Sequence, residues 1–432
     1  MKPLNVLIIG GGGREHALAW AISQSDLLGK LFIAPGNAGT ASLAKSLQLE
    51  PSDSQQVIRA IEENQIDFTI IGPEQPLVGG LVDDLSDAGY LVFGPKKQAA
   101  QLEGSKSFAK SVMEDAGVPT ATWKEFGRDD LSRAKEYAID HSLPVVIKAD
   151  GLASGKGVVI CHTQKEVDDF FDQLESEDPF GDVASRLVIE EFMEAEEASV
   201  FALTDGEHAR LLPPVQDHKQ IGEGDTGPNT GGMGAYLPAP VVDDEMMKQI
   251  KQTIITPVLN EMKNKGTPYS GVLYVGLMIT ESGPKVVEFN CRFGDPECQV
   301  LMPAIREDVL QLLYNTATGN IDDTPVDCTE QYFSCVMLVS GGYPGSYEKG
   351  KSVKGLNKVS EDSLVFHSGT KHNDNLTVTA GGRVLSVVAG GPTLEQSLRN
   401  TYADVQKINF EGVYYRNDIG SKGLKHTTQN YS

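Results

Sequence analysis

The sequence predicts a multidomain chain of the α/β and α+β classes that begins with a doubly wound parallel sheet. Near the N-terminus, short apolar runs alternate with polar stretches that suit helices, and a Gly or Pro closely follows each run. Later segments combine helices with paired strands. At 432 residues the chain is long enough for several domains with cores of their own.

The first domain is expected to hold its ligand at one edge of the sheet. Each predicted strand ends in a turn that contains Gly or Pro, and ligands of such sheets bind at the carboxyl ends of the strands. We therefore expect a ligand at these turns. The predicted strands are residues 6–9, 31–33, 68–71 and 91–93.

The later elements follow from apolar spacing and from helix breakers. Apolar residues recur at helical spacing over 105–116, and Gly117 and Pro119 end that helix. Residues 218–234 are polar and glycine-rich, so we expect a long loop there. Other helices are expected at 243–264 and 393–408, and strands at 144–148, 158–160, 187–189, 272–279, 285–290, 333–340, 376–379 and 383–389, with 272–279 and 285–290 paired as a hairpin.

Composition restricts the classes of function. The formal net charge of −23 argues against general binding of nucleic acids or anionic membranes, because both require a basic surface. No segment approaches the ~20 apolar residues of a membrane span, and the apolar run near the N-terminus is too short for a signal peptide. The 5 cysteines include no CxxC pair and the 8 histidines no HExxH motif. We therefore expect reduced thiols, a cytoplasmic location and no zinc hydrolase.

The stretch VLIIGGGGREHALAW (6–20) places a glycine turn between a buried strand and a helix. A dinucleotide site requires GxGxxG and an acid at the end of the second strand. Here Glu15 takes the place of the third glycine, and the second strand ends in APGN (34–37) without an acid. The turn still suits a small phosphorylated substrate, because it offers N–H groups at a helix N-terminus and Arg14 in the first turn. The alternative is a tight turn that binds no ligand.

A second glycine cluster, ADGLASGKGVVI (149–160), lies between two predicted strands. It is not a Walker A loop, because its glycine spacing is wrong, Gly157 follows the lysine and a P-loop opens a helix. A glycine-rich hairpin tip with one lysine is expected to close over phosphates as a lid. Lys148, at the end of a buried strand, requires an anionic partner, which is either a phosphate or a structural salt bridge.

Carboxylates cluster in VIEEFMEAEEASV (188–200). A strand ends at Glu190 and Glu191, and another begins at Glu197 after a short link. Carboxylates at such a hinge can accept hydrogen bonds from an adenine amino group and from ribose hydroxyls. The pattern by itself also fits a solvated acidic surface.

The stretch KVVEFNCRFGDPE (285–297) carries the strongest sign of chemistry. Alternate side chains of a strand share a face, so we expect Glu288, Asn290 and Arg292 on one side. Their carboxylate and amide oxygens suit Mg²⁺ that bridges nucleotide phosphates, and Arg292 would stabilise a transferring phosphoryl group. The alternative is a half-exposed strand with polar outward residues. The residues expected to point into a core are Val287, Phe289 and Cys291.

The glycine-rich loop at 218–234 is a further candidate. Its GGMG segment (231–234) offers successive N–H groups to an oxyanion. Asp217 and Lys219, where the loop begins, suit the two ends of an amino acid. Long loops of compact domains are usually functional or disordered.

Together these motifs closely resemble the phosphoribosylamine–glycine ligase (glycinamide ribonucleotide synthetase) family of ATP-grasp enzymes in de novo purine synthesis. The resemblance runs almost end to end, and the combination of motifs is highly specific. The final dozen residues match no family motif and are expected to form a loose tail. The matching stretches are IGGGGREHALAW (9–20), APGNAGT (34–40), IGPEQPLVGG (71–80), FGP (93–95), QLEGSKSFAK (101–110), IKADGLASGKGV (147–158), QDHK (216–219), DTGPNTGGMGAY (225–236), VEFNCRFGDPE (287–297), SGGYPG (340–345), HSGTK (367–371) and GGRVL (381–385).

The resemblance implies three domains: an N-terminal substrate-binding domain at 1–104, an ATP-grasp domain at 105–327 with a mobile lid near 120–190, and a C-terminal α+β domain at 328–432. It implies an enzyme that uses ATP to join glycine to 5-phosphoribosylamine, giving glycinamide ribonucleotide, ADP and phosphate through glycyl phosphate. The implied cofactor is Mg²⁺ or Mn²⁺. The implied partners are these small molecules and neighbouring purine-pathway enzymes.

The resemblance also assigns residues by position. Arg292, Lys148 and Asp295 are expected in catalysis, and Glu288 with Asn290 at the metal. The residues expected to bind ATP are Lys106, Lys148, Gly155, Lys156, Gly157, Glu190, Glu191, Phe192 and Glu197. The residues expected to bind the other substrates are Gly11, Gly12, Gly13, Arg14, Asn37, Glu74, Asp217, Lys219 and Gly232.

Three rival interpretations stay open. A different ATP-grasp carboxylate–amine ligase would differ only at residues 10–40, 71–95 and 216–236. A dinucleotide-dependent oxidoreductase is disfavoured by Glu15 and the missing ribose acid. A catalytically inactive nucleotide-binding regulator is disfavoured by the intact lysine, metal and arginine positions.

Overall fold

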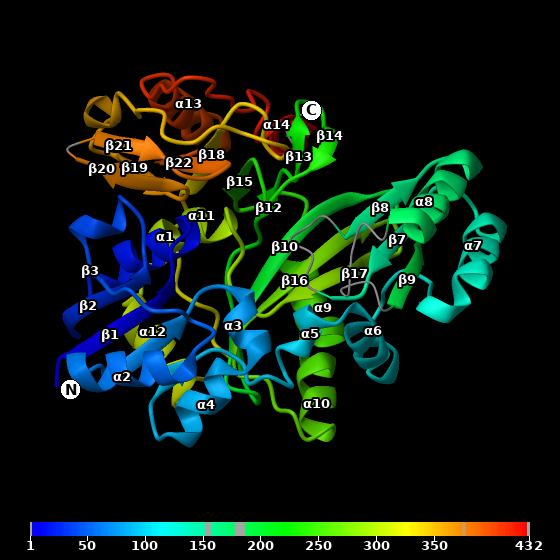
Figure 1. Cartoon of the computed structure of the whole chain (residues 1–432), viewed down its shortest axis with the longest axis horizontal. Helices are drawn as coiled ribbons and strands as arrows, with labels where there is room; N and C mark the ends of the chain where they lie inside the picture. Colours follow the sequence, from blue (N-terminus) through cyan, green and yellow to red (C-terminus); the bar gives the residue numbers. More distant parts are fainter. Residues whose placement is uncertain (1, 152–156, 178–185, 375, 430–432) are drawn as a thin grey trace.

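A five-stranded parallel sheet forms the N-terminal part of the computed structural model, which describes residues 2–151, 157–177, 186–374 and 376–429. Its strand order is β3 (Lys45–Ser46), β2 (Leu28–Pro35), β1 (Leu4–Gly10), β4 (Phe68–Ile71) and β5 (Val92–Phe93) (Figure 1). Leu7 and Ile9 pack with helices α2 and α4, whereas Val6 and Ile8 pack with α1 and α12. The predicted doubly wound sheet is therefore confirmed. The helices are α1 (Gly13–Ile22), α2 (Ser54–Asn64), α3 (Glu74–Gly79), α4 (Leu81–Asp87) and α12 (Val309–Ala317).

The order in which strands are added to this sheet reverses between β1 and β4, although all strands stay parallel. From β1 the chain adds β2 and β3 on one side and then crosses to β4 and β5 on the other. The carboxyl ends of β1 and β4, at Gly10 and Ile71, therefore form the crevice in which open α/β sheets bind ligands.

A four-stranded antiparallel sheet forms the region that the sequence predicts as a lid. Its order is β6 (Trp123–Gly127), β9 (Arg186–Glu191), β7 (Val145–Ala149) and β8 (Val158–Cys161). The side chains of this region form an apolar cluster of their own with helices α7 (Leu131–Asp140) and α8 (Gln164–Glu177). Strands β7 and β8 pair directly on either side of the glycine cluster at 149–160, as expected for a hairpin and not for a P-loop.

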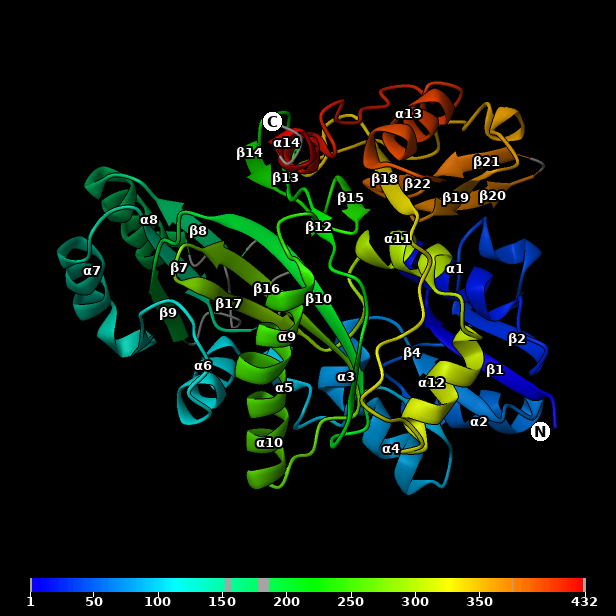
Figure 2. The same cartoon turned by 180° about the vertical axis from the view of Figure 1, so that it is seen from behind.

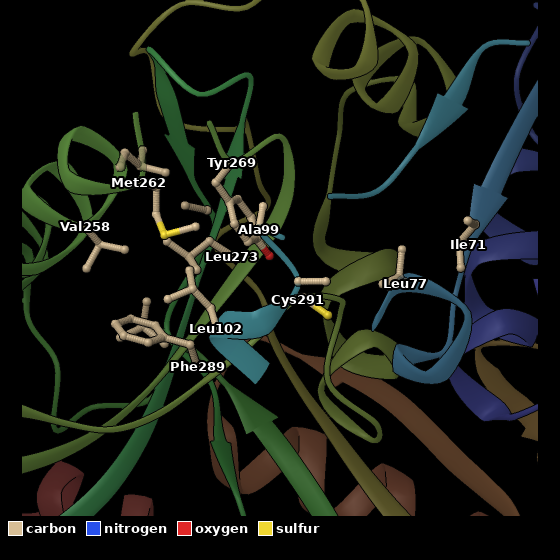
Figure 3. Packing of buried hydrophobic residues seen from close by; sticks show 14 of the residues in the cluster. Ile71, Leu77, Ala99, Leu102, Val258, Met262, Tyr269, Leu273, Phe289 and Cys291 are labelled. Atoms are coloured by element: carbon tan, nitrogen blue, oxygen red, sulfur yellow. The ribbon is translucent and has the colours of Figure 1, made fainter. Parts of the chain in front are cut away.

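A second four-stranded antiparallel sheet stands between the lid and the parallel sheet (Figures 1 and 2). Its order is β11 (Ala209–Leu211), β10 (Glu196–Thr204), β16 (Gly271–Thr280) and β17 (Gly283–Asn290), so the predicted hairpin of the last two strands is confirmed. One apolar cluster continues from Ile71 of β4 through Leu102 to Phe289 of β17 (Figure 3). The helices of this region are α5 (Gln101–Gly104), α6 (Lys106–Asp115), α9 (Asp244–Ile250) and α10 (Thr256–Asn264), with a π-helical turn at Lys251–Ile255 between the last two.

The C-terminal sheet draws strands from two distant parts of the chain. Its order is β12 (Gln216–Asp217), β15 (Gly234–Leu237), β18 (Tyr332–Val339), β22 (Arg383–Gly391) and β19 (Ser363–His367). Helix α11 (Glu297–Ala304) contacts both this sheet and α1, so it joins the C-terminal and N-terminal parts. Helix α13 (Leu394–Val405) is followed by α14 (Ser421–Gln429), so the expectation of a loose tail is wrong over 421–429. Short 3₁₀ helices occur at Thr40–Ser42, Arg128–Asp130 and Leu356–Lys358.

One expectation about a loop is corrected. The predicted loop at 218–234 contains a hairpin of β13 (Gln220–Gly222) and β14 (Thr226–Asn229), because Gly224 and Asp225 adopt the positive φ values of a tight hairpin turn. The predicted strand at 376–379 is confirmed as β21 (Leu376–Thr379), and it pairs with β20 (Thr370–Asn373) in a separate two-stranded sheet. In the part of the chain that the structure describes, no helix is both long and apolar enough to cross a membrane.

Candidate active site

A cavity of about 690 Å³ opens where the parallel sheet, the lid, the second antiparallel sheet and the C-terminal sheet meet. Most of the site residues predicted from the sequence line it, although they come from all parts of the chain. Those that do are Gly11, Gly12, Arg14, Glu74, Lys106, Lys148, Glu190, Glu191, Phe192, Glu197, Asp217, Lys219, Glu288, Asn290, Arg292 and Asp295.

The remaining predicted residues lie elsewhere. The amide of Asn37 donates to the carbonyl oxygens of Gly11 (2.9 Å) and His367 (2.7 Å), so it ties the glycine turn to the C-terminal part and does not line the cavity. Gly13, Gly157 and Gly232 are also absent from the lining. Gly155 and Lys156 lie outside the described residues.

The glycine turn already holds an anion of the protein itself. The Glu15 carboxylate accepts hydrogen bonds from the Gly12 N–H (2.6 Å) and from Nε of Arg14 (2.6 Å). A Cβ atom at Gly10 or Gly72 would lie 2.4 or 2.3 Å from the Glu15 side chain, which explains why glycine occupies both positions. Glu15 thus occupies donors that a dinucleotide would need for its pyrophosphate.

Two buried lysines share one carboxylate on the lid side of the cavity. Lys148 Nζ lies 2.9 Å from Glu190 Oε1, and Lys110 Nζ lies 3.1 Å from Glu190 Oε2. Burial lowers the pKa of Lys110 to about 8, although Glu190 opposes the shift. Lys106 Nζ donates to the Gly151 carbonyl at 2.9 Å, at the start of the glycine cluster. The anionic partner that Lys148 required is therefore present within the protein, and a row of lysines still faces the cavity.

A β-bulge at Val287 interrupts the alternation of buried and cavity-facing side chains along β17. The register shifts beside Gly276, so Val286 and Phe289 are buried while Val287 lines the cavity, and the prediction of Val287 as a core residue is wrong. Glu288 and Asn290 line the cavity together.

Arg292 follows the strand and is held by acids and an amide. Its Nη2 donates to Asn290 Oδ1 (2.7 Å) and to Glu103 Oε1 (2.7 Å), and its Nε lies 3.5 Å from Glu74 Oε2. Burial opposes the charge, but Glu103 and Glu74 raise the pKa of Arg292. Arg292 Nε is buried and has no hydrogen-bond partner among the described residues. The guanidinium is thus fixed by two hydrogen bonds and by the ion pair with Glu74.

Asp295 is fixed from the C-terminal side. Gln299 donates to Oδ1 of Asp295 (2.7 Å), and Arg383 Nη2 lies 3.3 Å from Oδ2. Arg383 Nη1 also donates to the main-chain carbonyls of Asp295 (2.6 Å) and Gly231 (2.5 Å). Burial opposes ionisation of Asp295, but Arg383 and Arg14 lower its pKa. A carboxylate is therefore presented beside the glycine turn.

Sequence reasoning missed five charged residues of the cavity: Glu15, Glu103, Lys110, Glu297 and Arg383. Lys110 lies four positions after Lys106 on one helix, and that spacing would have found it. Glu297 lies two positions after Asp295 in the quoted GDPE segment. Nothing local marks Glu103 or Arg383, because their partners are distant in the sequence.

The donor set fits a hard divalent cation. Burial opposes ionisation of Glu288, but nearby cations, chiefly Lys219 and Lys148, keep its pKa below the ordinary value. The amide oxygen of Asn290 retains a second lone pair beside the Arg292 bond. Within the described ranges, no group of three or more His, Cys, Asp or Glu side chains is arranged to hold a metal. Two oxygen ligands suit an ion that completes its shell with phosphates and water, as Mg²⁺ does.

Three family models together cover most of the chain. They are described as the N domain (residues 4–103), the ATP-grasp (A) domain (104–298) and the C domain (333–422) of phosphoribosylglycinamide synthetase. The phosphoribosylamine–glycine ligase of Rhodopirellula baltica is 46% identical over 431 residues, with 98% of this chain and 99% of the relative covered. The enzyme of the same name from Agrobacterium fabrum is 47% identical over 425 residues, with 98% and 99% covered.

Solved structures agree with this assignment. The crystal structure of phosphoribosylamine–glycine ligase from Thermotoga maritima matches with a TM-score of 0.85 and 34% identity, covering 96% of this chain and 100% of that chain. An ADP complex of N5-carboxyaminoimidazole ribonucleotide synthetase matches with a TM-score of 0.67 at 17% identity, covering 94% and 97%, and shows the shared fold alone. The family predicted from the sequence motifs is thereby confirmed: the chain belongs to the phosphoribosylglycinamide synthetase family.

Proposed function

We propose that this chain is an ATP-dependent ligase that joins glycine to 5-phosphoribosylamine and forms glycinamide ribonucleotide, ADP and phosphate in purine biosynthesis. The observation that carries the proposal is the cavity of about 690 Å³, which gathers residues from all three parts of the chain matched by the family models. A nucleotide and two further small molecules need such a shared site, because their reacting atoms must meet.

ATP is proposed to lie between the lid and the second antiparallel sheet. Lys106 and Lys148 face the cavity and would contact the phosphates. Glu190, Glu191 and Phe192, at the end of β9, would flank the adenine, and Glu197 would bind the ribose. A divalent ion, Mg²⁺ or Mn²⁺, would be held by Glu288 and Asn290, where it would neutralise phosphate charge.

Phosphoribosylamine is proposed to lie at the carboxyl ends of β1 and β4. Gly11, Gly12, Arg14 and Glu74 line that part of the cavity, with Asp295 facing them. The proposed domain division at 104/105 and 327/328 places this substrate against the N-terminal domain and ATP in the next domain.

The proposed chemistry needs no protein nucleophile. The glycine carboxylate attacks the γ-phosphoryl group of ATP and gives glycyl phosphate, while Arg292 and Lys148 offset the charge that gathers on the phosphoryl oxygens. The amine of phosphoribosylamine then attacks the acyl carbon, and phosphate leaves. The lid would exclude water, which protects the acyl phosphate from hydrolysis.

We also propose a cytoplasmic location and contacts with neighbouring purine-pathway enzymes. Free thiols at all five cysteines agree with a reducing compartment.

The first test is ADP release with ATP, glycine and freshly prepared phosphoribosylamine, each omitted in turn. We expect full turnover only when all three are present. Turnover with another carboxylic acid in place of glycine, and none with glycine, would favour a different ATP-grasp ligase. For the acyl-phosphate route, ¹⁸O from labelled glycine carboxylate should appear in the released phosphate, and its absence there would refute that route.

A further inference from the structure

One aspartate of the lid reaches across to a helix outside it. Asp150 follows β7 directly and is partly buried, and its carboxylate lies at the N-terminus of α6. Oδ1 of Asp150 accepts hydrogen bonds from the backbone N–H groups of Lys106 (2.6 Å) and Ser107 (3.2 Å). The Ser107 hydroxyl donates to Oδ2 at 2.7 Å, and the Ser105 hydroxyl lies 3.2 Å from both oxygens.

This contact completes the cap of α6. The N–H groups in the first turn of a helix have no partner within it. In α6 the N–H of Phe108 donates to Ser105 Oγ at 3.1 Å, which is the usual local cap, so those of Lys106 and Ser107 remain. Asp150 accepts both, and its negative charge suits the positive end of the helix dipole. A residue of the lid thus supplies what the local sequence of α6 leaves unsatisfied.

The contact lies beside both lysines that are assigned to the phosphates. Lys106 is the first residue of α6, and Lys148 lies two positions before Asp150. Both lysines line the cavity, whereas Asp150 is not among the described residues that line it. Lys106 Nζ also donates to the Gly151 carbonyl at 2.9 Å, so the same part of the lid holds the side chain of Lys106.

The two lysines belong to different packing units. Helix α6 packs in the apolar cluster that contains Phe289, whereas β7 packs in the cluster of the lid. Like charges also separate the lysines: burial lowers the pKa of Lys106, Lys148 lowers it further, and Asp150 opposes the shift. The spacing of the lysines therefore depends on contacts between the lid and α6. One is the ion pair of Lys110 with Glu190, and the other is Asp150.

We propose that Asp150 is a positioning residue that sets the spacing of Lys106 and Lys148 for the phosphates of ATP. The inference rests on the proposed function, which places those phosphates at these two lysines. Asp150 acts through the backbone of α6 and touches no substrate itself. It should therefore support binding of the phosphates, and not binding of the adenine or of the other two substrates.

The test compares three variants with the unmodified chain. Asp150→Ala removes the acceptor, whereas Asp150→Asn keeps an oxygen acceptor of the same size, and asparagine caps helices as well as aspartate does. Asp243→Ala removes the cap of α9, where Asp243 accepts the Met246 N–H at 2.8 Å. It is the matched control, because no residue of α9 is among the described residues that line the cavity.

The measurements separate the phosphates from the rest of the nucleotide. For each protein we would measure the dissociation constants of ATP with Mg²⁺ and of adenosine, which carries no phosphate. We would also measure kcat, KM for each of the three substrates, and thermal melting.

In Asp150→Ala we expect Kd and KM for ATP to rise about 10- to 100-fold. The Kd of adenosine and KM for glycine and for phosphoribosylamine should change less than about threefold, because the displaced lysines do not face these ligands. Asp150→Asn should stay within about threefold of the unmodified chain for ATP, since the acceptor is kept. Asp243→Ala should melt at a lower temperature, because α9 has lost its cap, and should keep both dissociation constants.

A second variant tests the same contact if Asp150→Ala does not fold. Ser107→Ala removes one donor to Oδ2 of Asp150 and leaves the backbone bonds in place. It should raise the Kd of ATP about 3- to 10-fold and leave that of adenosine unchanged. An unchanged Kd of ATP in this variant would overturn the positioning role.

The outcomes separate this inference from the proposed function. If the unmodified chain binds ATP but releases no ADP with glycine and phosphoribosylamine, the proposed function fails, and the dissociation constants still decide the role of Asp150. An unchanged Kd of ATP in Asp150→Ala, or equal losses for ATP and adenosine, would overturn that role. Equal losses of ATP binding in Asp150→Asn and Asp150→Ala would also overturn it, since the effect would then come from charge and not from placement of the helix.

Discussion

Single carboxylates decide much of the behaviour of this cavity. Glu190 neutralises two lysines, Glu15 occupies the glycine turn, and Glu103 fixes Arg292. Glu190 lies between two lysines that would repel one another without it. Glu288 differs, because its side chain is 42% exposed and so is available to a ligand. We therefore expect Glu288 to matter more for turnover than for stability.

The prediction at this scale is that Glu288→Gln lowers kcat at least about 100-fold while the protein stays folded. The neutral amide keeps the shape but loses the charge that would hold a divalent ion. Turnover should be measured across a titration of Mg²⁺ and of Mn²⁺, with thermal melting of the same samples.

The matched control is Glu281→Gln, in the exposed turn between β16 and β17 of the same hairpin. It should leave kcat unchanged. Near-normal turnover of Glu288→Gln at ordinary Mg²⁺ would remove this residue from the metal site.

At the scale of elements, a histidine joins α1 to the C-terminal sheet. His16 Nδ1 accepts a hydrogen bond from the backbone N–H of His367 in β19 at 2.8 Å. A ring nitrogen accepts only while it is unprotonated. Burial, followed by the neighbouring His367, lowers the pKa of His16 from 6.5 to about 3. The junction is therefore built for a neutral imidazole.

This pKa shift predicts a loss of stability in acid. Between pH 6.5 and about pH 3 the unfolded chain binds a proton at His16 that the folded chain does not, so the free energy of unfolding falls as the pH falls. At pH 5 the loss from this group is about 2 kcal/mol relative to pH 7. Urea unfolding at both pH values measures it.

The comparison uses His16→Gln, with His162→Gln at an exposed position of the lid as the control. In His16→Gln the difference in free energy of unfolding between pH 7 and pH 5 should be smaller by about 2 kcal/mol, even if the substitution lowers stability at pH 7. An unchanged pH dependence in His16→Gln would show that this histidine is not held neutral.

At the scale of the whole molecule, the buried apolar side chains form separate clusters, and the lid has one of its own. One cluster joins β1, β10, α11 and the C-terminal sheet, with members such as Ile8, Phe201 and Val388. The lid has a separate cluster that includes Phe171 and Ile147. A region with its own core can move without exposing the other cores, which agrees with the proposed role of this region as a lid over ATP.

The chain has one tryptophan in the lid and one outside it, so fluorescence can follow the unfolding of each part separately. Of its 2 tryptophans, Trp20 packs on the cluster that contains Phe201, and Trp123 lies in β6 of the lid. We predict that Phe171→Ala costs about 3–5 kcal/mol in the lid alone. Fluorescence unfolding of single-tryptophan proteins, made by Trp20→Phe or Trp123→Phe, should show the Trp123 transition shifting to lower urea while the Trp20 transition stays.

The reciprocal change is Phe201→Ala in the cluster on which Trp20 packs, and it should shift the Trp20 transition. Equal shifts of both reporters by Phe171→Ala would mean that lid and body unfold as one unit, contrary to the prediction.

Local spacing by itself determined the elements and many site residues of this protein. Apolar runs with Gly or Pro behind them predicted the parallel sheet, and alternation along β17 predicted that Glu288 and Asn290 share a face. The quoted motifs predicted the family. These signals are local because hydrogen-bond geometry fixes which side chains of one strand or helix lie together.

Only the tertiary structure decided how distant charges are paired. Glu103 meets Arg292 across 189 positions, Arg383 reaches Gly231 across 152, and Glu15 turns back into its own glycine turn. It also decided the hairpin at 220–229 and the bulge that turns Val287 toward the cavity. Such contacts depend on how separate sheets pack against one another, and burial then sets the strength of each charge pair. The residue spacing within a single segment encodes neither the packing of the sheets nor the strength of these charge pairs.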